Sequence, residues 1–234
     1  MSASALERED LGGKKKRLFV LGATGGTGRA IVEQARWRGH LVTAFVRSPE
    51  KLEPLLRDGL SVVQGDPRDR DALRAVMSGH DAVLSALGPA GLGPTTLVSD
   101  CARSTVAAME ATGVRRLLIV GVAVLFEADG LLSAIARRTF LRNVARDSAE
   151  MEHIVSESGL DWTIARPPRL TNGGLTRAYG VGDGRMPPGA RLTLSRADLA
   201  NFLLDELEHP AHVRRMVGLA SVKAAEREGA GELF

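Results

Sequence analysis

A glycine-rich stretch at residues 22–28 (GATGGTG) has the composition and spacing of a phosphate-binding turn. The apolar run 18–21 before it suits a buried parallel strand, and residues 29–35 after it have the pattern of an amphipathic helix. Unpaired N–H groups at a helix N-terminus attract anions, and glycines let a pyrophosphate approach the backbone closely. The strand before and the helix after favour a dinucleotide site over a plain tight turn. We therefore predict cofactor contacts from Gly22, Thr24, Gly25, Gly26, Thr27 and Gly28.

The residues that follow the second predicted strand (42–46) indicate which dinucleotide binds. A carboxylate at this position hydrogen-bonds the ribose 2′-hydroxyl of NAD, whereas an arginine accommodates the 2′-phosphate of NADP. This chain has Arg47 and Ser48 there and no carboxylate between residues 42 and 49, although a solvated arginine at a strand end is the plainer alternative. Asp66, after the third strand, is placed either to accept from the adenine amino group or to cap the next helix. We predict NADPH/NADP as the cofactor.

Strands and helices alternate through the first half of the chain, with further strands predicted at 61–64, 81–85 and 116–120. This alternation predicts an α/β fold, a doubly wound (Rossmann) parallel sheet with helices on both faces and a small C-terminal substrate-binding extension. Ligands bind such sheets at the carboxyl ends of the strands. The other predicted cofactor contacts lie at those ends: Ala86, Leu87, Gly88, Val120, Gly121, Pro167 and Pro168.

The second half of the chain is less regular. We expect helix over 131–156, a strand at 160–165, an irregular glycine-rich segment at 171–189, a short strand at 191–194, a helix capped by Ser195 and running to Glu208, and a last strand at 213–220. The expected organisation is a disordered leader (1–16), a single NAD(P)-binding domain (17–221) and a flexible tail (222–234). Residues at about 126–148 are a candidate helical lid over a bulky substrate, and an ordinary amphipathic helix packed on the sheet is the alternative.

Composition narrows the classes of partner. The net charge is +3 with acidic and basic residues interspersed, and aromatic residues make up only 4% of the chain, so we expect no nucleic-acid partner. The single cysteine, Cys101, excludes an internal disulfide framework and fits a reducing cytoplasm. The longest apolar run, 117–126, is too short to span a bilayer. We expect a cytoplasmic monomer or dimer with no metal site and no membrane partner.

Several of these motifs together resemble a known family. The stretch 18–47, the pair Gly65-Asp66, the segment 158–164 and the pair Arg166-Pro167 are similar to those of the atypical short-chain dehydrogenases. The NmrA-like group, which includes biliverdin-IX beta reductase/flavin reductase, is the most similar part of that family. The resemblance covers residues 17 to 220 and implies NADPH in an extended pose, with a flat ring system as substrate over the nicotinamide.

The catalytic residues of that family have no counterparts here. Short-chain dehydrogenases have a serine after the fifth strand, where this chain has Val122, and a Tyr-x-x-x-Lys on the next helix, where it has Val144 and Ser148. Flavin reductases of this type have a histidine after the Pro-Pro pair, where this chain has Arg169. The catalytic residues are therefore unknown. The candidates are Ser85, Arg169 and Tyr179, of which Tyr179 also has a purely structural interpretation.

Two functions fit these observations. The first is an NADPH-dependent oxidoreductase that passes hydride to a carbonyl or conjugated ring of a flat aromatic substrate, either a ketone or quinone, such as one from polyketide antibiotic biosynthesis, or a flavin. The proton would come from the substrate or from water, since the cofactor carries the hard chemistry. The second is a non-catalytic NmrA-like redox sensor that binds NADP(H) and reports its state to a partner.

Overall fold

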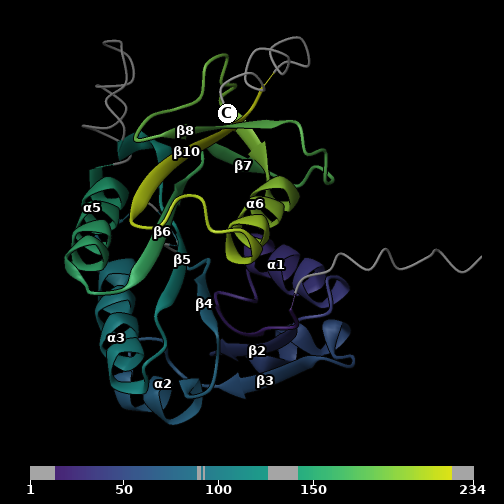
Figure 1. Cartoon of the computed structure of the whole chain (residues 1–234). Helices are drawn as coiled ribbons and strands as arrows, with labels where there is room; N and C mark the ends of the chain where they lie inside the picture. The colour runs from purple at the N-terminus through teal and green to yellow at the C-terminus, as the bar shows by residue number, and fades with distance from the viewer. Residues whose placement is uncertain (1–13, 89–90, 92, 126–141, 223–234) are drawn as a thin grey trace, which may run out of the picture.

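The computed structural model describes residues 14–88, 91, 93–125 and 142–222. Its main sheet has the strand order β3-β2-β1-β4-β5-β6-β10-β8 (Figure 1). All neighbouring strands are parallel except β8, which pairs antiparallel with β10. The order reverses beside β1, as in a Rossmann fold, so the predicted doubly wound fold is confirmed. The strands are β1 (Arg17–Leu21), β2 (Leu41–Val46), β3 (Leu60–Gln64), β4 (Ala82–Ser85), β5 (Arg116–Val120), β6 (Asp161–Arg166), β8 (Tyr179–Asp183) and β10 (Arg215–Ser221).

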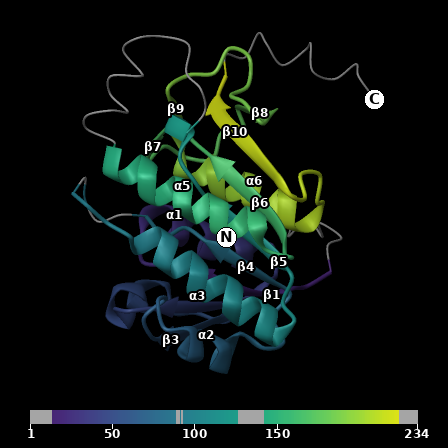
Figure 2. The same cartoon turned by 90° about the vertical axis from the view of Figure 1, so that its left-hand side faces the viewer.

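Helices cover both faces of the sheet. In Figure 1, α1 (Gly26–Trp37) and α6 (Arg196–Glu208) lie on one side, and α2 (Arg70–Met77), α3 (Leu97–Thr112) and α5 (Arg142–Glu157) lie on the other. Figure 2 looks onto α3 and α5, which run side by side. The alternation of β1 explains the two layers, because successive strand residues face opposite sides. Leu18 and Val20 pack with the α1–α6 cluster, whereas Phe19 and Leu21 pack with the α3–α5 cluster.

The local signals in the sequence mostly have their expected structural effect. Gly113 ends α3 with a left-handed φ of 74°, and the Ser195 hydroxyl accepts a hydrogen bond from the Asp198 N–H at 2.9 Å. Two short 3₁₀ helices also occur: η1 (Pro49–Leu55) follows β2, and η2 (Ala123–Leu125) follows β5.

The glycine-rich segment 171–189 is more regular than predicted. It contains β8, and the preceding β7 (Arg169–Thr171) pairs with β9 (Thr193–Ser195) in a small second sheet. The glycines allow two backbone segments to pack closely here, because a Cβ on Gly182 would lie 2.5 Å from the Arg185 carbonyl oxygen. The Asp198 carboxylate also accepts hydrogen bonds from the Thr176 and Arg177 N–H groups, which fixes the segment to the start of α6.

Parts of four predictions lie outside the described residues. These are residues 1–13 of the leader, 126–141 of the candidate lid, 131–141 of the helix expected over 131–156, and 223–234 of the tail. The rest of the lid candidate, 142–148, forms the first turns of α5. In the part of the chain that the structure describes, no helix combines the length and apolar character needed to cross a membrane.

Candidate functional site

The three spaced glycines of the turn have different structural roles. Gly22 has a φ of +76°, and a Cβ there would lie 2.6 Å from the Ala86 carbonyl oxygen. A Cβ on Gly28 would collide with the backbone of Gly22, so this glycine lets α1 pack closely against the turn. A Cβ on Gly25 would meet only the Gly22 carbonyl oxygen, at 3.4 Å. Gly25 therefore borders open space, as a phosphate would require.

The start of α1 has the electrostatics of an anion site. Gly25 is its N-cap and gives no side-chain hydrogen bond, and no acidic residue lies in the first turn. The first N–H groups of the helix are thus left for a ligand, at the positive end of the helix dipole. Arg29 stabilises the turn, because its Nε donates a hydrogen bond to the Thr24 carbonyl oxygen at 3.3 Å.

A cleft of about 490 Å³ opens beside this turn at the carboxyl ends of the strands. The turn forms one wall, and the segments that follow β4, β5 and β6 form the others. Ten of the sixteen predicted cofactor residues line it: Gly25, Gly26, Thr27, Ala86, Leu87, Gly88, Val120, Gly121, Pro167 and Pro168. Gly22, Thr24 and Gly28 belong to the turn behind this surface.

Arg47, Ser48 and Asp66 lie at the ends of β2 and β3, outside the cleft lining. Arg47 is exposed, and no described carboxylate forms an ion pair with its guanidinium. Asp66 is bound by Arg68, whose Nη2 lies 2.6 Å from Oδ2 and whose backbone N–H donates to Oδ1. Hydrogen bonding by Arg68 lowers the pKa of Asp66, so this group stays a carboxylate and keeps acceptor capacity for an amino group.

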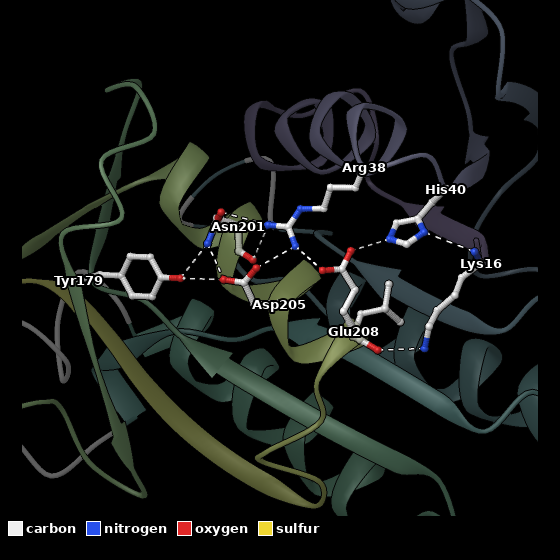
Figure 3. Close-up of polar contacts among 8 residues, drawn as sticks. Lys16, Arg38, His40, Tyr179, Asn201, Asp205 and Glu208 are labelled. Atoms are coloured by element: carbon white, nitrogen blue, oxygen red, sulfur yellow. Dashed lines mark hydrogen bonds and ion pairs between the residues drawn. The ribbon is translucent and has the colours of Figure 1, made fainter. Parts of the chain in front are cut away.

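The three catalytic candidates do not line the cleft. Ser85 is buried in β4, between β1 and β5. Arg169 is exposed on β7. Tyr179 lies on β8, where its hydroxyl accepts a hydrogen bond from Asn201 Nδ2 at 3.0 Å (Figure 3). Burial raises the pKa of Tyr179 to about 12, which disfavours proton donation near neutral pH.

The cleft also contains residues that we did not predict as site residues. They come from α3, the end of β5, α5, β7 and α6: Val98, Val122, Ser148, Met151, Leu170 and Arg196. Val98, Met151 and Leu170 are apolar and carry no motif, so spacing gives no signal for them. Val122 and Ser148 had a signal, because they occupy positions at which short-chain dehydrogenases have catalytic residues. The sequence does contain one indication for Arg196. It follows the N-cap Ser195 and so lies at a helix N-terminus, as the glycine turn does.

Ser148 is the polar side chain that α5 presents to the cleft. The residue is 3% exposed, and its hydroxyl has no hydrogen-bond partner among the described residues. The adjacent Asp147 fixes its position, because Oδ2 accepts from the Val98 N–H at 3.1 Å and Oδ1 accepts from the Ser99 N–H at 3.0 Å. The start of α3 and the first turns of α5 are thereby joined beside the cleft.

A buried ion pair supports the floor of the cleft. Arg166, at the end of β6, donates from Nε to Glu152 Oε1 at 3.0 Å. Gly121 lies directly over this pair, since a Cβ there would be 2.6 Å from Glu152 Oε1. Burial raises the pKa of Glu152, and the hydrogen bond from Arg166 opposes that shift. The ion pair therefore has a structural role, and Glu152 does not line the cleft.

Comparison with known proteins identifies the family. Residues 22–210 match a family model described as NAD(P)H-binding, and the match includes the glycine turn and the strand ends that form the cleft. The chain belongs to this NAD(P)H-binding family. The cofactor class inferred from the turn and the resemblance to atypical short-chain dehydrogenases are thus confirmed.

Individual relatives agree with this assignment. The chain is 27% identical to the protein YwnB of Bacillus subtilis over 84% of this chain and 94% of YwnB. It is 30% identical to a 3-diazoavenalumate denitrifying reductase of a Streptomyces species, over 92% of this chain and 74% of that protein. A Rossmann-fold NAD(P)-binding family protein of Shigella flexneri superposes with a TM-score of 0.71 at 25% identity, covering 89% of this chain and 94% of the other.

Proposed function

We propose that the protein is an NADPH-dependent reductase that transfers hydride to a carbonyl or conjugated ring of a flat aromatic substrate. The composition of the cleft is the main support for this proposal, because the cleft extends from the glycine turn to a region of apolar side chains. Leu87, Val98, Val122, Met151 and Leu170 supply this region from five separate segments. Apolar lining with few polar groups is what small-molecule pockets offer to a flat ring system. The name of the Streptomyces relative, a reductase, supports the same reaction class.

The residues present fit the cofactor that the family binds. The uncapped start of α1 would hold its diphosphate, and the open space at Gly25 leaves room for that group. When bound, NADPH supplies the hydride. The chain's own contribution is to hold the acceptor close and to exclude water from the apolar part of the cleft.

The lining offers no strong acid for the proton. None of the lining residues in the described part of the chain has a carboxyl, imidazole, phenol or amine side chain. This observation supports protonation by water or by the substrate's own hydroxyl. The Ser148 hydroxyl, which has no hydrogen-bond partner in the described part of the chain, would donate a hydrogen bond to the acceptor oxygen as negative charge develops there. Replacing one such donor costs about 10²–10³-fold in kcat in known enzymes, so Ser148→Ala should slow turnover and leave the Kd for NADPH unchanged.

Preference for NADPH over NADH would come from Arg47. Its exposed guanidinium forms no ion pair with a carboxylate of the described residues, although it lies close enough to Asp66 to interact with it electrostatically, and Ser48 adds a hydroxyl donor beside it. In steady-state kinetics, Arg47→Ala should raise KM for NADPH by about tenfold or more, which corresponds to about 1.4 kcal/mol, and leave KM for NADH nearly unchanged. An equal rise of KM for NADPH and NADH would show that Arg47 does not determine the preference between the two cofactors.

The reaction class is tested by mixing the protein with NADPH and a panel of quinones, flavins and polycyclic ketones, following loss of the nicotinamide absorbance. We expect turnover with at least one acceptor. Leu170→Trp, which fills the apolar region, should raise KM for that acceptor. Leu192→Trp is the matched control, because Leu192 is 85% exposed and outside the cleft lining.

The alternative, an NADP(H)-binding redox sensor, is favoured by the same absence of a strong acid from the described lining. The panel distinguishes the two functions. Tight NADPH binding without turnover on any acceptor would support the sensor and contradict the reductase.

A further inference from the structure

Arg196 reaches the glycine turn from the opposite end of the chain. It is the first residue of α6 and lines the cleft together with Gly25, Gly26 and Thr27. Its Cδ lies 2.7 Å, and its Nε 2.8 Å, from the position that a Cβ on Gly26 would occupy. The absence of a side chain at Gly26 thus allows a cation to lie against the first residue of α1.

Two further contacts fix this arrangement. Nη1 of Arg196 donates to Asn172 Oδ1 at 2.7 Å, which orients the guanidinium from the β7 side. The two helices are also joined directly, because Gln34 Nε2 on α1 donates to the Ala197 carbonyl oxygen at 2.8 Å. The guanidinium has no ion pair with a described carboxylate, so its charge remains available to an anion in the cleft.

We propose that Arg196 binds the diphosphate of the dinucleotide together with the α1 N–H groups, with Asn172 as its positioning residue. Phosphate recognition by a guanidinium fork is strong and directional, and here it adds to the field of the helix N-terminus. The diphosphate would be held by two distant parts of the sequence, the turn at 22–28 and the start of α6. The inference rests on NAD(P)H binding, which the family shows, and not on the reductase reaction.

Equilibrium binding to dinucleotides and their fragments tests this role without any turnover. Removing a hydrogen bond to a charged group costs about 1.5–3 kcal/mol. Arg196→Ala should therefore lower the affinity for NADPH, NADH and ADP-ribose by about ten- to a hundredfold. These ligands share the diphosphate. Affinity for 2′-AMP, which lacks the diphosphate, should not change. Arg47→Ala should give the reverse pattern, weakening NADPH and 2′-AMP and leaving NADH unchanged.

Two more variants control the result. Arg196→Lys keeps the charge without the fork and should recover part of the lost affinity. Arg191→Ala removes an exposed arginine outside the cleft lining and should change no affinity by more than about twofold, since surface charges are screened by salt. Asn172→Ala should weaken the same three ligands as Arg196→Ala, to a smaller extent.

Unchanged affinity of Arg196→Ala for NADPH and ADP-ribose would overturn the proposal. If KM for the acceptor rises at the same time, Arg196 serves an acidic group of the substrate instead, and the reductase proposal stands. Failure of the reductase proposal would give a different result. No acceptor of the panel would then be reduced, while Arg196→Ala would still weaken the binding of every ligand that contains the diphosphate.

Discussion

Glycines at equal spacing in the sequence have unequal roles in the structure. Gly28 permits packing of α1 on the turn, whereas Gly25 borders the space in which a phosphate would lie. The sequence motif predicts the turn but cannot separate these roles, because each depends on what the absent Cβ would meet.

This difference predicts opposite effects of two alanine substitutions. Gly28→Ala forces backbone apart and should lower the free energy of unfolding by about 1–3 kcal/mol, as overpacking does. Gly25→Ala should leave stability nearly unchanged and weaken NADPH binding about tenfold, equivalent to about 1.4 kcal/mol. Urea unfolding and NADPH titration of both variants measure the two quantities. Equal loss of stability in both variants would contradict the assignment.

Tyr179, the only tyrosine of the chain, reports its own environment. Because burial raises its pKa to about 12, the tyrosinate absorbance of the folded protein should develop at higher pH than that of the unfolded chain, near pH 10. The folded state then holds its proton more tightly, so the stability from this group is complete below about pH 10 and falls as pH rises toward about 12. Titration near pH 10 in the native protein, or loss of turnover in Tyr179→Phe, would contradict a structural role.

At the scale of elements, Asp147 joins α5 to α3. Its carboxylate accepts from two N–H groups at the start of α3 and from the Ser99 hydroxyl at 2.6 Å, with all of these groups buried. A buried acceptor on a neighbouring helix thus does the work of an N-cap for α3, whose own cap residue, Thr96, makes no side-chain cap hydrogen bond.

Asp147→Ala should therefore lower the free energy of unfolding by about 2–3 kcal/mol, because it leaves buried donors unsatisfied. Glu150→Ala on the same helix is the control, since Glu150 is exposed and pairs with an exposed arginine, and it should cost less than about 1 kcal/mol. Urea denaturation distinguishes them, and a loss equal to that of the control would refute the capping role. Asp147→Ala should also reduce turnover, because it frees Ser148 to move from the cleft.

The helices and strands of the first half could be predicted from the periodicity of apolar residues and from the glycines that end elements. The bounds of β5 and the end of α3 at Gly113 illustrate this. Strand β8 could not, since its glycine content is typical of a loop and its pairing partner, β10, lies far along the chain. The cofactor half of the cleft could be predicted from the glycine motif and from the carboxyl ends of the predicted strands. The apolar half could not, because Val98, Met151 and Leu170 are brought together only by the fold.

At the scale of the whole molecule, a polar network joins the first and last helices (Figure 3). Arg38, the C-cap residue of α1, has a side chain that is 7% exposed, and its Nη1 lies 2.7 Å from both Asp205 Oδ1 and Glu208 Oε2 on α6. Glu208 also lies 2.9 Å from His40 Nε2. The N-terminal motif and the C-terminal half are thereby parts of one packed structure.

Breaking this network should destabilise the molecule as a unit. Arg38→Ala should lower the free energy of unfolding by about 3 kcal/mol, because the largely buried Glu208 loses its ion pair with the guanidinium and keeps only the contact with His40. Glu33→Ala, at an exposed position on the same helix, should cost less than about 0.5 kcal/mol. Calorimetry should show a single transition for both variants, shifted to lower temperature only for Arg38→Ala. Two separate transitions would contradict the prediction of one domain over residues 17–221.

We propose that the cleft beside the glycine turn binds NADPH and that its hydride passes to an aromatic acceptor held there. The most direct measurement is the rate of NADPH oxidation with a quinone acceptor, for the wild-type protein and for Gly25→Asp, which places a carboxylate against the α1 N-terminus. We expect steady oxidation by the wild-type protein, and we expect the folded Gly25→Asp variant to lose both oxidation and NADPH binding. Oxidation that persists at the wild-type rate in Gly25→Asp would contradict this proposal.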